Sequence, residues 1–500
     1  MTRTVNTLLL GIIFLPLLYL LYTSFEALSL ASLFTDVLII ASSNKLFNSL
    51  QLSLSVATLS TLLSLFTTLV YYHIRRKSRR HLFLLMLLFL FATAPIIYAS
   101  LFSQVDFFSS LRPFTRSLIV LTLWLTPLGS TLMILMLRYI DQASLQLLGL
   151  LPISQSVIFK KLIIKQMLLS LLGLFFLIFM MAFVQEEVPS FFGYRTYAED
   201  FLSRIILMEE FSSILIYALP FVLLATGGTL FFYLFFKRHF FRLFNDLLTP
   251  LENLNFSYFH YLSKLGILFY IAVVFSLFFG LAVQIDTSQL MILLSENSMM
   301  ILESFILVFF AALTATAVAL YLVRTFHHVH STLLIIMAFL ALYWFLPPSL
   351  TALVILKLSQ LLYFESDLYD YFLLLYGYVL RVLPIALIII MLTSQHHLKN
   401  PLFKVLDISR TRLFFTIELP LQWKKWLLTF MVLFFLILNE VSTTVLLVPA
   451  GFETIIIKIY NLMHYGDFAT VAFLSLIQSI LVMIFLLPLI LLKDDHDHRS

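Results

Sequence analysis

The sequence predicts an all-α polytopic membrane protein with about twelve transmembrane helices, arranged as two parallel six-helix repeats. The first observation is composition: the 500 residues are 61% hydrophobic and only 11% charged, whereas soluble domains carry about 25% charged residues. The second is a series of long apolar runs, and the third is a set of weak internal matches at a nearly constant offset. The composition excludes a soluble enzyme, a disordered chain and a fibrous protein. Because cysteine is absent, disulfides, thiol catalysis and cysteine-based metal sites are also excluded.

A membrane helix needs about 20 mostly apolar residues, and twelve runs of this kind are expected. They cover residues 7–24, 46–72, 81–103, 117–137, 162–185, 211–236, 265–285, 299–323, 331–347, 369–392, 427–448 and 469–492. The stretch 349–364 follows a Pro-Pro pair and is expected to form an interfacial or re-entrant helix. The first run follows Arg3 and lacks a small-residue cleavage site, so we interpret it as a retained anchor.

The basic residues predict the orientation, because Lys and Arg concentrate in cytoplasmic loops. With the N-terminus inside, the inner segments hold 23 Lys and Arg residues, the outer segments hold 7, and Arg381 falls within a span. This predicts a multi-pass membrane protein, surrounded by lipid, with both termini cytoplasmic. The same rule accounts for the net charge of +5, which therefore gives no argument for a nucleic-acid partner.

Internal matches indicate a duplication. Three pairs share an offset of 255–257 residues, namely Ser49 with Ser304, Pro127 with Pro384, and Phe211 with Phe468. The dipeptide Glu-Val also occurs twice, at 187–188 and at 440–441. We therefore expect one six-helix repeat over residues 1–250 and a second over 251–500, both in the same orientation because six is even.

Two cytoplasmic segments, 138–163 and 393–425, are longer than a plain connection and fall at equivalent places in the two repeats. They resemble the EAA loop of binding-protein-dependent ABC transporter permeases, whose pattern is E-A-A, three residues, G, nine residues, I, one residue and L-P. The second segment has Ile417, Leu419 and Pro420 at the end of this pattern, and the first has its glycine, Gly149. Neither segment has the E-A-A head, and Asp407 stands at the second glycine position.

The resemblance covers most of the chain. Residues 186–211, 378–384 and 439–466 are similar to segments of fused double-length permeases for ferric iron, and thiamine permeases share this fused plan. It implies the type I ABC importer permease fold, with a dimer of cytoplasmic ATP-binding subunits and a periplasmic substrate-binding protein as partners. The residues that it assigns to ATPase coupling are Asp141, Ala143, Gly149, Phe159, Asp407, Arg410, Ile417, Leu419 and Pro420.

The chain carries no nucleotide-binding motif of its own. A P-loop needs a Gly-Lys pair to hold phosphates, and none of the 12 glycines is followed by Lys. We therefore expect no catalytic residue, no cofactor and no enzymatic activity, with energy supplied by the separate ATPase. Gly149 would permit a tight turn in the first loop, and Pro420 would end a coupling helix in the second. Ordinary interfacial loops remain the alternative interpretation of both segments.

Three charged residues are candidates for the translocation pathway. Arg381 lies within a span, where a charge costs about 2.5–3.5 kcal/mol, so it either faces the pathway, pairs with a carboxylate or snorkels. Glu187 and Glu440 occupy matched outer ends of the fifth and eleventh spans. They either line the pathway or are solvated at helix ends. The other outer carboxylates, including Glu186, are expected to be mostly solvated.

The charge balance outside the membrane suggests the substrate. The outer segments hold 18 carboxylates against 7 basic residues, and a cleft of one sign concentrates ions of the opposite sign. We expect a cationic substrate, with ferric iron first and thiamine second, and no resident metal ion.

Two other classes are considered. A twelve-helix secondary transporter also has parallel repeats, but it would need coupling carboxylates within its spans. A membrane-embedded enzyme would need clustered intramembrane His, Asp or Glu residues, which the predicted spans lack.

Overall fold

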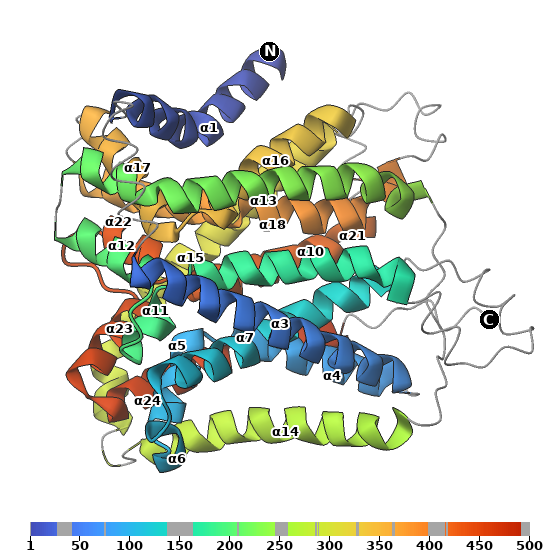
Figure 1. Cartoon of the computed structure of the whole chain (residues 1–500), viewed down its shortest axis with the longest axis vertical. Coiled ribbons are helices and arrows are strands. Elements are labelled where there is room, and N and C mark those ends of the chain that lie inside the picture. Colours follow the sequence, from blue (N-terminus) through green and yellow to red (C-terminus); the bar gives the residue numbers. More distant parts are fainter. Residues whose placement is uncertain are drawn as a thin grey trace, which may run out of the picture.

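Helices make up all the regular secondary structure in the part of the chain that the structure describes (Figure 1). The structure is a computed structural model, and it describes residues 2–27, 43–74, 77–137, 164–207, 210–245, 259–285, 288, 290–326, 330–362, 366–398, 416 and 419–491. Most of both predicted coupling loops lies outside these ranges. The all-α prediction is confirmed for the described residues.

The helices fall into two groups in chain order, called here the first series and the second series. The first series comprises α1 (Thr2–Ala27), α3 (Asn44–His73), α4 (Lys77–Ala92), α5 (Pro95–Ser103), α6 (Asp106–Ser109), α7 (Pro113–Leu137), α10 (Ile164–Phe183), α11 (Glu187–Phe191), α12 (Tyr197–Ile206) and α13 (Phe211–Asn245). The second comprises α14 (Phe259–Gln284), α15 (Leu290–Phe326), α16 (His330–Phe345), α17 (Pro348–Leu362), α18 (Asp367–Leu398), α21 (Leu419–Leu438), α22 (Ser442–Leu447), α23 (Ile455–Tyr465) and α24 (Phe468–Leu491).

Eight of these helices are long and apolar enough to cross a membrane, and two bent helix pairs raise the number to ten. The remaining two predicted spans correspond to α10 and α21, whose apolar parts, Leu171–Phe183 and Trp426–Leu438, are shorter. The chain is thus a multi-pass membrane protein by the length and composition of its helices. The number twelve stays a prediction.

Two predicted spans depart from a single continuous helix. Residues 81–103 do not form one straight span, because the chain bends by 81° between α4 and α5. Pro95 is the first residue of α5 and forces Ala94 into an extended conformation with ψ 139°. The run 427–448 also ends early, because α21 stops at Leu438 and the polar pair Asn439-Glu440 leads into the separate helix α22.

The second bend lies between α16 and α17, which meet at 103°. Residues 346 and 347 separate the two helices, and proline cannot donate a backbone hydrogen bond across such a break. The expected helix at 349–364 is therefore present as α17, turned away from the axis of α16.

Helices α3 and α7 are joined by a ladder of hydrogen bonds. The hydroxyls of Ser60, Ser64, Thr68 and Tyr72 donate to the carbonyls of Thr122, Thr126, Ser130 and Ile134, at distances of 3.0–3.4 Å. Small residues at four-residue spacing let membrane helices approach closely. The contact is tight at Gly129, where an added Cβ would lie 2.3 Å from Ser64 Oγ. This pair fixes the centre of the first series.

The first helix of each series lies against the other series. Helix α1 packs on α17 as well as on α13, and α14 packs on α3, α4 and α5 as well as on α24. The two helices lie at opposite edges of the bundle (Figure 1). The Tyr343 hydroxyl of α16 donates to the Ile13 carbonyl of α1 at 2.6 Å, which adds a hydrogen bond between α1 and the second series. The short helices α11, α12, α22 and α23 gather at one end of the bundle, on the left in Figure 1.

Candidate functional site

The structure brings the three predicted pathway residues, Glu187, Arg381 and Glu440, to one cavity of about 70 Å³. The cavity lies where α10 and α21 end and where the α4–α5 and α16–α17 bends expose backbone. Its lining residues come in related pairs that are 253 residues apart, such as Phe91 with Trp344 and Pro95 with Pro348. Both halves of the chain therefore contribute residues to one cavity.

Arg381 is fixed by the broken helix beside it. Its guanidinium donates to the carbonyls of Tyr343, Trp344 and Leu346, the last two at 3.1 and 2.9 Å. These carbonyls lie at the end of α16, where the last turn of any helix has no partners of its own. The guanidinium also lies 5.1 Å from the centre of the Trp344 ring. Arg381 therefore caps α16 with a positive charge and is only 9% exposed.

Trp124 has the corresponding position in the first series, 257 residues before Arg381. Its indole Nε1 donates to the Phe91 carbonyl at 3.1 Å, at the end of α4. The rings of Phe91 and Trp124 stack with their centres 5.6 Å apart. One break is thus capped by an aromatic donor and the other by a cation, so the cavity is nearly symmetric in shape and asymmetric in charge.

Glu440 is the partner of Arg381. Its Oε2 lies 3.9 Å from Arg381 Nε, and its Oε1 accepts from the backbone amide and the hydroxyl of Thr443. The structure therefore contains the expected pairing of Arg381 with a carboxylate. Arg381 also lines the cavity, so it pairs with Glu440 and faces the cavity at the same time.

Glu186 was expected to be solvated, and this expectation is wrong. The side chain is only 2% exposed, because the chain turns inward between α10 and α11. Its Oε1 accepts from the Ser349 hydroxyl of α17 at 2.6 Å, while its Oε2 is buried without a hydrogen-bond partner, as is Oε2 of Glu187. Sequence reasoning missed Glu186, although its place beside Glu187 and opposite Asn439 in the repeat was a usable signal.

Asn439, at the position equivalent to Glu186, also reaches across to the other half. Its amide donates to the Ala92 carbonyl at the end of α4, and its Oδ1 accepts from Gln478 Nε2 at 2.6 Å. Each of the two turns that follow α10 and α21 therefore bonds to the helix break of the opposite series. These contacts join the two halves beside the cavity.

A second cavity of about 270 Å³ adjoins the first and shares Phe91, Met181, Trp344 and Leu436 with it. Its other walls come from α4, α7, α10, α16, α18 and α21 and are almost wholly apolar, with Leu132, Ile385 and Ile388 among them. The two adjoining cavities thus differ in chemistry, one being lined by charged residues and the other by apolar ones.

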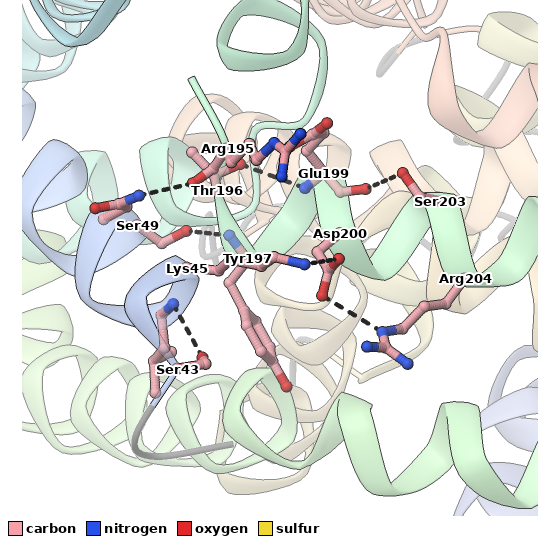
Figure 2. Close-up of polar contacts among 12 residues, drawn as sticks. Ser43, Lys45, Ser49, Arg195, Thr196, Tyr197, Glu199, Asp200, Ser203 and Arg204 are labelled. Carbon is pink, nitrogen blue, oxygen red and sulfur yellow. Dashed lines mark hydrogen bonds and ion pairs between the residues drawn. The ribbon is translucent and has the colours of Figure 1, made fainter. Parts of the chain in front are cut away.

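The short helix α12 is held on α3 by a buried polar contact, which Figure 2 shows together with the surrounding charges. The backbone amide of Tyr197 donates to Ser49 Oγ at 2.7 Å. The same contact recurs in the second series, where the amide of Ile455 donates to Ser304 Oγ at 3.1 Å. Ser49 and Ser304 are one of the pairs from which the repeat was predicted.

The carboxylates around α12 are mostly paired. Asp200 bonds to Lys45 of α3 and to Arg204 within α12 (Figure 2). Burial raises the pKa of Glu199, and the neighbouring charge of Asp200 adds to the effect. Among the described residues, no three His, Asp or Glu side chains are grouped so that they could hold a metal ion.

The ATPase-coupling residues are only partly described. Asp141, Ala143, Gly149, Phe159, Asp407, Arg410 and Ile417 lie outside the described residues. Leu419 and Pro420 are the first two residues of α21, where proline fits because the first turn of a helix has free amides. Pro420 thus lies in the first turn of α21. The coupling segment that it was expected to end lies outside the described residues.

These features define a helical multi-pass membrane protein with a buried charged cavity between related helix breaks. The chain matches no family model, no curated protein and no solved structure. Its function is therefore argued from its own residues.

Proposed function

We propose that this chain is the transmembrane permease subunit of a binding-protein-dependent ABC importer, built from two parallel six-helix repeats, 1–250 and 251–500. The observation that carries the proposal is the convergence of Glu187, Arg381 and Glu440 on one cavity between two equivalent helix breaks. A transporter needs such a polar site away from lipid, because intramembrane charges are retained for function or paired.

The recurring contacts support the duplication. Helix α3 packs on α7 and α10 as α15 packs on α18 and α21. The bonds from Tyr197 to Ser49 and from Ile455 to Ser304 are equivalent, and so are the caps by Trp124 and Arg381. In this proposal the repeats rock against each other around the cavity, with α10 and α21 followed by the turns that close it.

A separate cytoplasmic ATPase dimer supplies the energy in this proposal, acting on segments 138–163 and 393–425. A periplasmic binding protein delivers the solute at the end where α11, α12, α22 and α23 gather. The chain lies in the bacterial inner membrane with both termini cytoplasmic. The positive-inside distribution of basic residues and the resemblance of the loops support this arrangement.

The transported solute in this proposal is a cation, with ferric iron and thiamine as the two candidates from the resemblance. Support comes from Glu186 and Glu187, which add two carboxylates to a cavity where Arg381 already pairs with Glu440. The unpartnered carboxylate oxygens also favour a second candidate function. A proton- or ion-coupled secondary transporter uses buried carboxylates of this kind.

Co-purification tests the proposal. The chain carries an affinity tag and is co-expressed with the ATP-binding subunit of its own operon or genome neighbourhood, and the two are expected to elute together. Gly149→Glu combined with Asp407→Arg should abolish co-elution without loss of the permease from the membrane. Lys357→Gln, on the opposite side in the predicted topology, is the control. Co-elution that survives the double substitution would remove the coupling role.

A further inference from the structure

The central site has two adjoining parts of different chemistry. The charged cavity of about 70 Å³ holds a few atoms, since one water needs about 10–15 Å³ by this measure. The apolar cavity of about 270 Å³ holds a considerably larger body. Because the two share Phe91, Met181, Trp344 and Leu436, one molecule can occupy both at once.

The charged part has three carboxyl groups, those of Glu186, Glu187 and Glu440, and one guanidinium, that of Arg381. Arg381 is engaged by three carbonyls and by Glu440. Glu186 is buried, lines the cavity and leaves Oε2 without a hydrogen bond, although Ser442 lies beside it. Glu187 also leaves Oε2 buried and unpartnered. A buried carboxylate oxygen without a hydrogen bond is costly, so a cation beside these two Oε2 atoms would relieve the cost.

The walls next to these carboxylates are aromatic. Phe91, Trp124 and Trp344 all line the charged cavity, and aromatic faces attract organic cations within about 6 Å of the ring centre. A bare metal ion needs several clustered oxygen or nitrogen ligands, and the described residues contain no such group. The apolar cavity has Thr131 as its one hydroxyl-bearing lining residue and no His, Asp or Glu, so it does not offer a metal ion a set of ligands.

We infer that the central site binds an organic cation with an apolar body, its charged head between Glu186 and Glu187 and its body in the apolar cavity. This inference rests on the proposed function and names its substrate class. In this inference the charged cavity selects for the cationic head of the substrate, and the apolar cavity selects for its body. It also disfavours the first of the two candidate solutes, since ferric iron has no apolar part.

Equilibrium binding to the purified full-length chain in lipid nanodiscs tests the inference without any partner protein. The probe is benzyltrimethylammonium, compared by calorimetry with tetramethylammonium, which lacks the apolar body, and with benzyl alcohol, which lacks the charge. We expect saturable binding of benzyltrimethylammonium and at least about tenfold weaker binding of the other two. A ferric salt should not displace the bound benzyltrimethylammonium.

Two substitutions address the compartments one at a time. Glu186→Gln should weaken binding of benzyltrimethylammonium at least tenfold, whereas Glu199→Gln, on α12 outside the cavity, should leave it unchanged. Leu132→Phe, which reduces the volume of the apolar cavity, should weaken the binding of benzyltrimethylammonium and leave the binding of tetramethylammonium unchanged. Equal binding of benzyl alcohol, competition by ferric ion or indifference to Glu186→Gln would overturn the inference. If the chain still co-purifies with the ATPase in that case, the proposed function stands and only the substrate class is wrong.

Discussion

At the residue scale, Arg381 joins the stability of the fold to the charge of the cavity. Its guanidinium satisfies three carbonyls of α16 and compensates Glu440. A charge within a span is expected to be functional by default, and here the function includes capping a broken helix. The same position in the first series is filled by Trp124, which caps α4 without any charge.

Replacing Arg381 by Met should therefore destabilise the protein by about 3–5 kcal/mol, because it leaves the Glu440 charge and the carbonyls without partners. Thermal unfolding of the purified chain in detergent measures this, with Lys357→Met, at a half-buried position of α17 that does not line the cavity, as the control. Adding Glu440→Gln to Arg381→Met should recover part of the loss. A double variant as unstable as the sum of the two single variants would contradict the pairing.

Gly129 allows a second prediction at this scale. Gly129→Ala places a Cβ 2.3 Å from Ser64 Oγ, and such overpacking costs about 1–3 kcal/mol. Gly227 is also helical, and an added Cβ there meets nothing within 4 Å, so Gly227→Ala should be neutral or stabilising by up to about 1 kcal/mol. The same unfolding assay compares the two. Equal effects would show that the close contact between α3 and α7 is absent.

At the element scale, the helix breaks shape the site. Pro95 and the pair Pro347-Pro348 turn α5 and α17 away from α4 and α16. Single prolines inside α1, α7, α13 and α18 do not break those helices. At the two breaks, the carbonyls at the ends of α4 and α16 need other partners, and Trp124, Arg381 and Asn439 supply them.

The paired contacts of the short helices give a prediction at this scale. Ser49→Ala leaves the buried Tyr197 amide without an acceptor, and Ser304→Ala does the same to Ile455, so each should cost about 1–3 kcal/mol. Ser53→Ala is the control, because Ser53 Oγ donates only to carbonyls of its own helix. Hydrogen exchange should show faster exchange at α12 in Ser49→Ala and at α23 in Ser304→Ala. Loss of protection in one variant alone would argue that the contacts are not equivalent.

The sequence predicted the apolar helices well, because an apolar run of about 20 residues has few alternatives to a buried or membrane helix. It did not predict the α4–α5 bend, because Pro95 is a single proline within an apolar run, as are Pro127 and Pro384, which do not break their helices. It placed Glu187, Arg381 and Glu440 among the site residues through repeat position and intramembrane charge. Glu186 and Asn439 were missed because burial at a chain turn depends on tertiary contacts that no periodicity encodes.

At the scale of the whole molecule, the orientation predicted from the basic loops can be tested by labelling. Cysteines introduced singly at Lys77 and Lys425 should be protected from an impermeant thiol reagent in intact cells, and cysteines at Arg195 and Glu453 should be labelled. The chain has no cysteine of its own, which removes background labelling. Labelling of position 77 from outside would overturn the orientation.

The central claim is that a separate ATPase drives this chain as an importer, and transport in reconstituted liposomes tests it most directly. Liposomes contain the chain with or without its ATP-binding subunit, the periplasmic binding protein is added outside, and uptake of labelled cation is measured with enclosed ATP, with a proton gradient, or with neither. We expect uptake only when the binding protein, the ATP-binding subunit and ATP are all present. Uptake by the chain alone, driven by the gradient, would contradict it and favour a secondary transporter.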